Sequence, residues 1–377
     1  MVHDPLAVLD EELRVLRQTG LYRTQRVLET EQAARVTMDD RPLVTLSTNN
    51  YLGFTTHPRL RAAAVAAIEE YGVGAGSVRT IAGTMSLHEQ LEARLAAFKH
   101  APAALTFQSG YATNVGVLSA LLTEKDVVIS DELNHASIID GLRMTAAKKL
   151  IYAHADLDVL ETRLREAREL RPRLILIITD GVFSMDGDIA PLPGIVALAE
   201  QYGAAVMVDD AHSSGVLGRN GRGTVDHFSL HGRVQLQVGT LSKAIGAVGG
   251  YVAGSMAVRD LLIQRARPYL FTTAQPPSVA ATCLAALDVL EDEPDLLERL
   301  WENTRYFQTG LREVGFDTGQ TATPITPVMV GDEGRAATFS ARLFDAGVFV
   351  QPIIFPMVAR GRARLRAIVT AGHSRDD

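Results

Sequence analysis

The sequence predicts an α/β protein with a mostly parallel sheet covered by helices, followed by a smaller α+β C-terminal domain. First, expected helices and strands alternate between residues 85 and 208, as in βα units that build a parallel sheet. Second, the pattern changes after residue 291 to a long charged helix and short strands. Third, 377 residues with 47% apolar side chains are enough to bury a large core.

The N-terminal segment 6–19 is expected to form a helix. Its leucines recur at spacings of three and four, which places them on one face, and Gly20 would end the helix. A short strand at 43–46 and a helix at 59–71 follow. We therefore expect an N-terminal helix and arm at 1–45 ahead of the main domain.

The central region is expected to form a large domain at 46–290. Its helices are predicted at 85–99, 112–122, 135–146, 157–169 and 192–202, and its strands at 103–107, 126–130, 149–153, 174–179 and 205–208. The small C-terminal domain is expected at 291–377, with a helix at 295–314 and strands near 325–330, 348–350 and 363–369.

Composition excludes several classes of function. A net charge of -7 offers no basic surface for nucleic acid or anionic membranes. The single cysteine, Cys283, excludes an intrachain disulfide and a Cys-rich metal site, and we expect no metal. No segment has the pattern of a signal peptide, a transit peptide or a membrane span, so we expect a cytoplasmic protein.

Lys243 is the first candidate for chemistry. It follows an expected strand that ends in Thr240 and Ser242, and glycines come directly after it. A lysine that is partly desolvated there loses its proton readily, as a Schiff-base nucleophile must. A solvated lysine at a strand end fits this segment equally well.

Asp209, Asp210 and His212 follow the apolar strand at 205–208. A buried carboxylate needs a cationic partner, and a protonated pyridinium nitrogen is one. A metal site made of Asp and His is an alternative, and so is a helix N-cap by either aspartate. Taken alone, the segment favours the cap.

Gly110 and Tyr111 stand between an expected strand and an expected helix. Backbone N–H groups at a helix start can bind a phosphate, although such junctions are common. The glycines at 72–76 follow a helix rather than a strand, so they do not form a dinucleotide-binding loop.

His135 and Ser184 follow two further strands. His135 could stack on a planar cofactor or move a proton, and a structural histidine is the alternative. Glycines around Ser184 indicate a tight loop. Ligands bind beyond the carboxyl ends of strands in such sheets, so these residues are expected in one site with Tyr111, Asp209 and Lys243.

Together these segments resemble the α-oxoamine synthases, a family of pyridoxal-phosphate (PLP) enzymes of fold type I. The resemblance extends from about residue 13 to the C-terminus. It is carried by motifs at 49–53 (NNYLG), 134–141 (NHASIIDG), 179–187 (TDGVFSMDG), 208–212 (VDDAH), 240–243 (TLSK) and 363–366 (ARLR).

The resemblance implies a seven-stranded, mostly parallel sheet in the large domain, with PLP bound to Lys243 as a Schiff base. It also implies that Asp209 pairs with the pyridine nitrogen, that His212 reaches the phenolic oxygen and that His135 stacks on the ring.

Further site residues are implied in the same way. Gly110, Tyr111 and Thr240 would bind the phosphate, and Thr272 and Thr273 would complete that site from the other subunit of a homodimer.

Three residues are implied for the substrate. Asn49 and Ser184 would line its side of the site, and Arg366 would hold its carboxylate, since a guanidinium can pair with both oxygens.

The implied activity is a PLP-dependent acyltransferase that joins an amino acid to an acyl-CoA. Segments 180–187, 267–271 and 299–305 look most like the glycine C-acetyltransferase branch, which makes 2-amino-3-oxobutanoate from glycine and acetyl-CoA. The alternative is 8-amino-7-oxononanoate synthase, which uses L-alanine and pimeloyl-CoA with decarboxylation in biotin biosynthesis, or one enzyme for both reactions. Ile354 replaces an arginine typical of that branch.

Other classes also retain some of these residues. A fold-type-I aminotransferase or aldolase would keep Lys243 and Asp209 but need no CoA channel, whereas a non-catalytic binding protein would need none of the site residues. The chain ends at Asp377, short of the closing helix usual in the family, so the small domain is expected to be incomplete.

Overall fold

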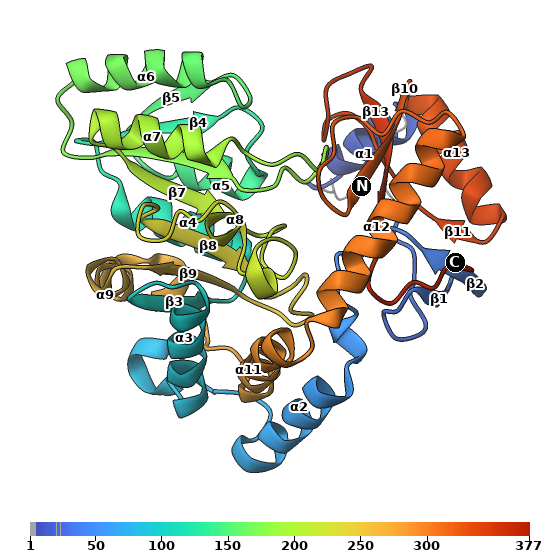
Figure 1. The fold of residues 1–377 in the computed structure, drawn as a ribbon, viewed down its shortest axis with the longest axis horizontal. Coiled ribbons are helices and arrows are strands. Elements are labelled where there is room, and N and C mark those ends of the chain that lie inside the picture. The colour runs from blue at the N-terminus through green and yellow to red at the C-terminus, as the bar shows by residue number, and fades with distance from the viewer. Residues whose placement is uncertain (1–4, 20, 23) are drawn as a thin grey trace.

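A computed structural model describes residues 5–19, 21–22 and 24–377 of the chain. Its larger lobe is built on a seven-stranded sheet with the order β3-β9-β8-β7-β6-β4-β5 (Figure 1). Only β9 runs antiparallel to its neighbours, which confirms the predicted mostly parallel sheet. The strands are β3 (Ala103–Phe107), β4 (Val127–Asp131), β5 (Lys148–Tyr152), β6 (Ile175–Asp180), β7 (Ala205–Asp209), β8 (Leu236–Thr240) and β9 (Gly250–Gly254).

Helices cover both faces of this sheet. Side chains of β4 and β6 are buried on both sides, as expected for continuous apolar strands in a parallel sheet. One face packs against α6 (Leu157–Glu169) and α7 (Leu192–Tyr202). The other packs against α4 (Gly110–Leu121), α5 (Ala136–Arg143), α9 (Met256–Arg265) and α10 (Arg267–Leu270).

A second group of helices packs at the β3 end of the large lobe. It contains α2 (Pro58–Tyr71), α3 (Ser86–Phe98) and α11 (Pro277–Asp292), and α11 contacts both of the others. Cys283 is fully buried in this cluster, where burial raises the pKa of its thiol to about 12.

The smaller lobe contains two three-stranded sheets. The sheet β10-β13-β12 packs against α13 (Glu333–Asp345), and α12 (Asp295–Glu313) crosses from the large lobe (Figure 1). The second sheet joins N-terminal β1 and β2 to β11, so the N-terminal arm lies with the C-terminal part of the chain. The strands are β1 (Arg35–Met38), β2 (Arg41–Thr45), β10 (Ile325–Gly331), β11 (Val348–Phe349), β12 (Gln351–Ile353) and β13 (Ala363–Ile368). Domain boundaries at residues 45 and 290 stay a proposal.

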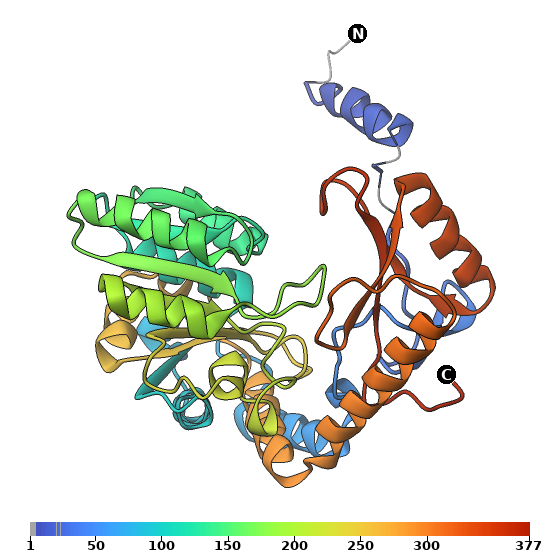
Figure 2. The same ribbon diagram turned by 45° about the horizontal axis from the view of Figure 1, so that its top comes forward.

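The helix α1 (Val8–Gln18) stands away from both lobes (Figure 2). None of its described side chains is buried, and Leu9, Leu13 and Leu16 are exposed along one side. The helix expected at 6–19 is therefore present. Gly20, its predicted end, lies outside the described residues.

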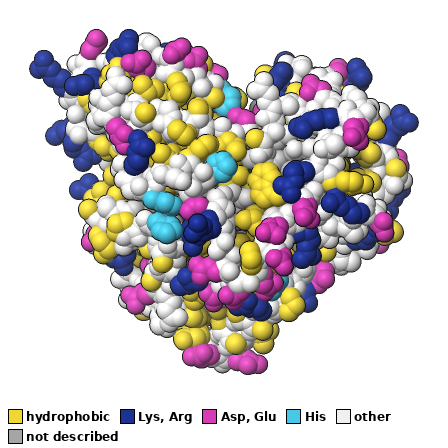
Figure 3. Space-filling view, viewed as in Figure 1, with side chains coloured by type: hydrophobic (Ala, Val, Ile, Leu, Met, Phe, Trp, Pro, Cys, Tyr) yellow, Lys and Arg dark blue, Asp and Glu magenta, His cyan; other side chains and the backbone are white. Residues whose placement is uncertain are grey.

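Three strands end side by side at the edge of the large sheet that faces the small lobe. Asp180 at the end of β6 pairs in register with Asp209 at the end of β7, and Asp209 pairs with Val238 of β8. The molecule is hollowed between its two lobes, and acidic and basic side chains are mixed over the face seen in Figure 3. Within residues 5–19, 21–22 and 24–377, no helix has both the length and the apolar character needed to cross a membrane.

Candidate active site

A cavity of about 240 Å³ lies at the carboxyl ends of β6, β7 and β8. Every residue expected there from a strand end lines it, and the structure therefore brings together segments far apart in the sequence. The predicted residues among its lining are Gly110, Tyr111, His135, Ser184, Asp209, His212, Thr240 and Lys243.

Lys243 lies three residues beyond the buried strand β8. The pKa of its amine is lowered to about 8, chiefly because burial disfavours the charged form. The carboxylates of Asp209 and Asp180 act in the opposite direction, and the Arg366 guanidinium adds to the lowering. A neutral amine is consequently accessible near neutral pH. Lys243 is not the solvated strand-end lysine that its own segment left open.

Asp209 ends β7 and is only 5% exposed. Its Oδ2 accepts a 2.6 Å hydrogen bond from Asn114 Nδ2, and its Oδ1 accepts one of 2.9 Å from the Ala211 N–H. The residues after it form turns rather than a helix. The helix-cap interpretation of Asp209 is therefore wrong.

Asp210 has a different role from its neighbour, because Lys99 neutralises it. Lys99 Nζ lies 2.7 Å from Asp210 Oδ2, and both side chains are fully buried. Asp210 also accepts hydrogen bonds from Ser213 and Thr224. Its Oδ1 also accepts a 3.3 Å hydrogen bond from the Thr224 N–H at the start of α8 (Thr224–His227), but Asp210 does not cap a helix that follows it in the chain. Asp210 does not line the cavity, so of the two aspartates only Asp209 faces the site.

His212 forms a hydrogen bond with Tyr51. Its Nδ1 lies 2.8 Å from the Tyr51 hydroxyl, and burial lowers the pKa of the imidazole well below its usual value, helped by Lys243 and Arg366. Asp209 and His212 do not belong to the group of three possible metal ligands found among the described residues. A metal site at Asp209 and His212 thus has no support.

A chain of polar contacts connects His135 to Asp209. His135 Nδ1 lies 2.7 Å from Ser137 Oγ, and Asn114 Nδ2 donates both to Ser137 Oγ at 2.9 Å and to Asp209. The backbone N–H of His135 also donates to Asp180 Oδ2 at 3.1 Å. Partial burial lowers the pKa of His135 and Lys243 lowers it further, while the carboxylate of Asp209 raises it. The contact with Ser137 orients the ring.

The start of α4 forms one end of the cavity. The Ala112 N–H donates to Ser109 Oγ and the Thr113 N–H to Ser109 O, while the described residues supply no acceptor for the N–H groups of Gly110 and Tyr111. A Cβ on Gly110 would lie 3.3 Å from Thr240 Cβ, so glycine permits this close approach. Two free N–H groups at a helix start, beside a threonine hydroxyl, suit a phosphate.

Arg366 reaches the site from β13 of the small lobe. Its Nε donates to the Ser184 carbonyl, and its Nη2 lies 3.5 Å from Asn49 Oδ1. The three residues expected on the substrate side therefore lie together, although Ser184 contacts Arg366 through its backbone. Burial lowers the pKa of Arg366, while the nearby Tyr51 raises it.

Four of the predicted residues do not line the cavity: Asn49, Arg366, Thr272 and Thr273. Arg366 contacts the lining residue Ser184, and Asn49 contacts Arg366, whereas the two threonines lie elsewhere. Both are exposed after α10, and the Thr273 carbonyl accepts a hydrogen bond from the Gln108 side chain. They cannot serve the site of their own chain in this arrangement.

Sequence reasoning assigned no role in the site to five polar residues that line it: Ser109, Asn114, Ser137, Asp180 and Ser242. Asn114 follows Gly110 by four positions on α4, a spacing that places both on one helix face and could have identified it. Asp180 ends a strand in the same way as Asp209. Burial, together with the charge of Asp209, raises the pKa of its carboxyl well above the usual value.

Comparison with known proteins assigns the family. Residues 41–377 match the family Aminotransferase class I and II. The chain is 57% identical over 98% of its length to the 8-amino-7-oxononanoate synthase of Bacillus pumilus (strain SAFR-032), covering 94% of that protein. It is similar at 58% identity, with the same coverage, to the synthase of the same name from Symbiobacterium thermophilum.

Solved structures of the same family have a similar fold. Serine palmitoyltransferase from S. paucimobilis, solved with a bound PLP–myriocin aldimine, superposes with a TM-score of 0.93 at 34% identity, over 99% of this chain and 95% of that one. The 8-amino-7-oxononanoate synthase of Francisella tularensis superposes with a TM-score of 0.75 at 29% identity, over 89% of this chain and 94% of that one.

The chain belongs to the α-oxoamine synthases. As a member of that family it is a PLP-dependent acyltransferase of fold type I. The cavity fits the cofactor at three points: a partly buried amine with a lowered pKa, a buried carboxylate, and two N–H groups at a helix start that have no acceptor among the described residues.

Proposed function

We propose that this α-oxoamine synthase is an 8-amino-7-oxononanoate synthase, which joins L-alanine to pimeloyl-CoA and releases CoA and carbon dioxide. The observation that carries the proposal is the name shared by relatives 57% and 58% identical to it along 98% of its length. They favour the second of the two activities expected from the sequence over the glycine reaction. Ile354 departs from the arginine typical of 8-amino-7-oxononanoate synthases, but this one position is weaker evidence than similarity along the whole chain.

Lys243 is the proposed attachment point of the cofactor and the base of the reaction. When bound, PLP supplies an electron sink that stabilises negative charge at the amino-acid Cα. The amine, with a pKa of about 8, can remove the Cα proton once the amino acid has displaced it, and can return a proton later.

Asp209 is proposed to pair with the ring nitrogen and hold a proton there. Its carboxylate is buried and oriented from both sides by Asn114 and Ala211, which suits a fixed partner for a cation. His135 would cover one face of the pyridine ring, and His212 would contact the phenolic oxygen.

Arg366, Asn49 and Ser184 form the proposed substrate side. The guanidinium would pair with the amino-acid carboxylate and so fix the plane of the substrate. Gly110, Tyr111 and Thr240 would bind the phosphate at the opposite end, since free N–H groups are available there.

Thr272 and Thr273 support a homodimer with shared active sites, because they lie exposed and outside the cavity of their own chain. A cytoplasmic location is part of the same proposal.

A crossed substrate assay tests the proposed activity. Release of CoA would be measured for glycine, L-alanine and L-serine, each with acetyl-, pimeloyl- and palmitoyl-CoA, and the product would be identified by mass spectrometry. We expect L-alanine with pimeloyl-CoA to give kcat/KM at least about tenfold above any other pair, a difference of about 1.4 kcal/mol in transition-state binding. A maximum for glycine with acetyl-CoA would overturn the proposal.

A further inference from the structure

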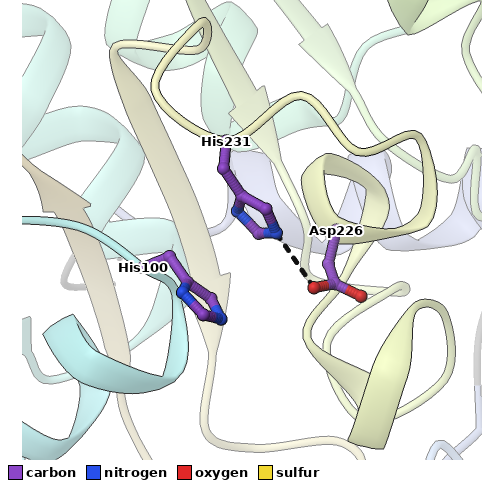
Figure 4. Close-up of side chains that lie close together, drawn as sticks. All are labelled: His100, Asp226 and His231. Carbon is purple, nitrogen blue, oxygen red and sulfur yellow. Dashed lines mark hydrogen bonds and ion pairs between the residues drawn. The ribbon is translucent and has the colours of Figure 1, made fainter.

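A second cluster of polar side chains lies on the surface, outside the cavity. It consists of His100, Asp226 and His231, and the three side chains converge from separate segments (Figure 4). His100 follows the end of α3, Asp226 belongs to α8 (Thr224–His227), and His231 lies in the loop before β8. None of the three lines the cavity that holds Lys243.

The geometry points to a metal site: we propose that His100, Asp226 and His231 bind one divalent transition-metal ion of the zinc class. One ligand atom from each residue lies within 4.8 Å of the others. Two imidazole nitrogens and one carboxylate oxygen form a common ligand set for zinc, with water in the fourth position.

The observed distances suit this chemistry. Zinc binds nitrogen and oxygen at about 2.0–2.2 Å, so neighbouring ligands of a tetrahedral ion lie about 3.3 Å apart. His231 Nε2 and Asp226 Oδ1 are already 3.0 Å apart. The ring of His100, whose centroid lies 4.5 Å from that of His231, is exposed and can close the remaining gap by rotating.

The carboxylate is already oriented for a ligand. Asp226 Oδ2 accepts a 2.6 Å hydrogen bond from the Arg219 N–H, which leaves Oδ1 directed at the histidines. A hydrogen bond to the second oxygen is a usual feature of metal-binding carboxylates. Only 14% of the Asp226 side chain is exposed, so the oxygen is held in place rather than freely solvated.

Nearby charges are mixed. The charged side chains that act on His100 are Asp226, Arg222 and Arg219. Arg222 lies 3.7 Å from Glu291, which offsets its charge, whereas Arg219 opposes a bound cation. We therefore expect weaker binding than a site without a neighbouring cation would give.

The position of the site indicates what an ion would do. Lys99, the residue before His100, forms the buried ion pair with Asp210 beside the catalytic Asp209. An ion would connect the turn after α3 to α8. Because it would bind only the folded protein, it would stabilise the segments that surround the Lys99–Asp210 pair.

Zinc binding to the tag-free holoenzyme tests the proposal. After dialysis against a chelator, ZnCl₂ would be titrated by calorimetry into wild type, His100→Asn, His231→Asn and the control His227→Asn. Asparagine suits residue 100 because its φ of 51° is in the left-handed region that asparagine tolerates. His227 is exposed and adjacent to Asp226 but lies outside the cluster, which makes it a matched control.

We expect one zinc ion per wild-type and His227→Asn chain, with a Kd weakened at least tenfold in His100→Asn and His231→Asn. Zinc should raise Tm by a few degrees in wild type and His227→Asn, but not in His100→Asn or His231→Asn. Absence of saturable binding to wild type, or equal binding by all four proteins, would overturn the site. Neither readout depends on which acyl-CoA the enzyme uses, so failure here is distinguishable from failure of the proposed function.

Discussion

Asn114 Nδ2 donates a 2.6 Å hydrogen bond to Asp209 Oδ2, and the same nitrogen lies 2.9 Å from Ser137 Oγ. The amide thus fixes the buried carboxylate at the end of β7 relative to His135, which contacts Ser137. Asn114 is a positioning residue in this arrangement, acting through Asp209.

Replacing Asn114 by alanine should lower kcat about ten- to hundredfold, because a hydrogen bond to a charged group contributes about 1.5–3 kcal/mol. KM for the amino acid should change little, since Asn114 is not on the proposed substrate side. Steady-state kinetics, together with the cofactor absorbance spectrum across pH, would check this. A variant with a normal spectrum and wild-type kcat would contradict the role.

Lys243→Ala should abolish both turnover and covalent attachment of the cofactor, because no other amine lines the cavity within the part of the chain described. Borohydride reduction followed by peptide mapping would identify the modified lysine. The exposed Lys125→Ala variant is the control and should behave as wild type. Cofactor trapped on a different lysine in the wild-type enzyme would refute the assignment.

The lowered pKa of Lys243 predicts how cofactor uptake depends on pH. The neutral amine is the nucleophile, so the rate at which apoenzyme takes up PLP should rise with pH and level off above about 8. Below that value it should fall about tenfold per pH unit, as the amine gains a proton. Stopped-flow absorbance would measure the rate. A rate that still rises steeply above pH 9 would indicate an ordinary lysine.

Arg366→Lys should raise KM for the amino acid about ten- to hundredfold, since an ammonium cannot pair with both carboxylate oxygens. KM for the acyl-CoA should change far less. The exposed Arg362→Lys, near the start of the same strand, is the matched control. Equal KM values in Arg366→Lys and wild type would exclude a carboxylate-binding role.

A subunit-mixing experiment tests the shared site. Lys243→Ala and the double variant Thr272→Ala/Thr273→Ala should each be nearly inactive as homodimers. When the two variants are refolded together in equal amounts, about half of the dimers should contain one subunit of each kind. One of the two sites in each mixed dimer is intact, so about a quarter of wild-type activity should return. No recovery despite mixed dimers on native mass spectrometry would show that the threonines do not serve the neighbouring site.

Much of the large sheet was predictable because its strands are short, apolar and separated by helices. The strand expected at 103–107 and the helices at 157–169 and 192–202 coincide with β3, α6 and α7. β9 was missed: it reads Gly-Tyr-Val-Ala-Gly, too short and glycine-rich for a local signal. Its place between β3 and β8 depends on antiparallel pairing with both neighbours.

The site was predictable where a strand ended in a polar residue, and less so elsewhere. Asp209 ends β7, and Lys243 follows the polar end of β8 by three residues. Asn114 is inside a helix, and its importance follows from the approach of α4 to the end of β7. Arg366 was expected only through the family resemblance, since nothing in its strand places it beside Asn49, which follows the N-terminal arm.

By itself the sequence determined the α/β class, the order of the strand ends and the kind of chemistry they carry, because these follow from local patterns and residue type. Tertiary structure decided which of two adjacent aspartates faces the site. Lys99, distant in sequence, neutralises Asp210 and leaves Asp209 for the cavity. Tertiary structure also decided the pKa of Lys243, since burial and the charges of Arg366, Asp209 and Asp180 come from segments that only folding brings together.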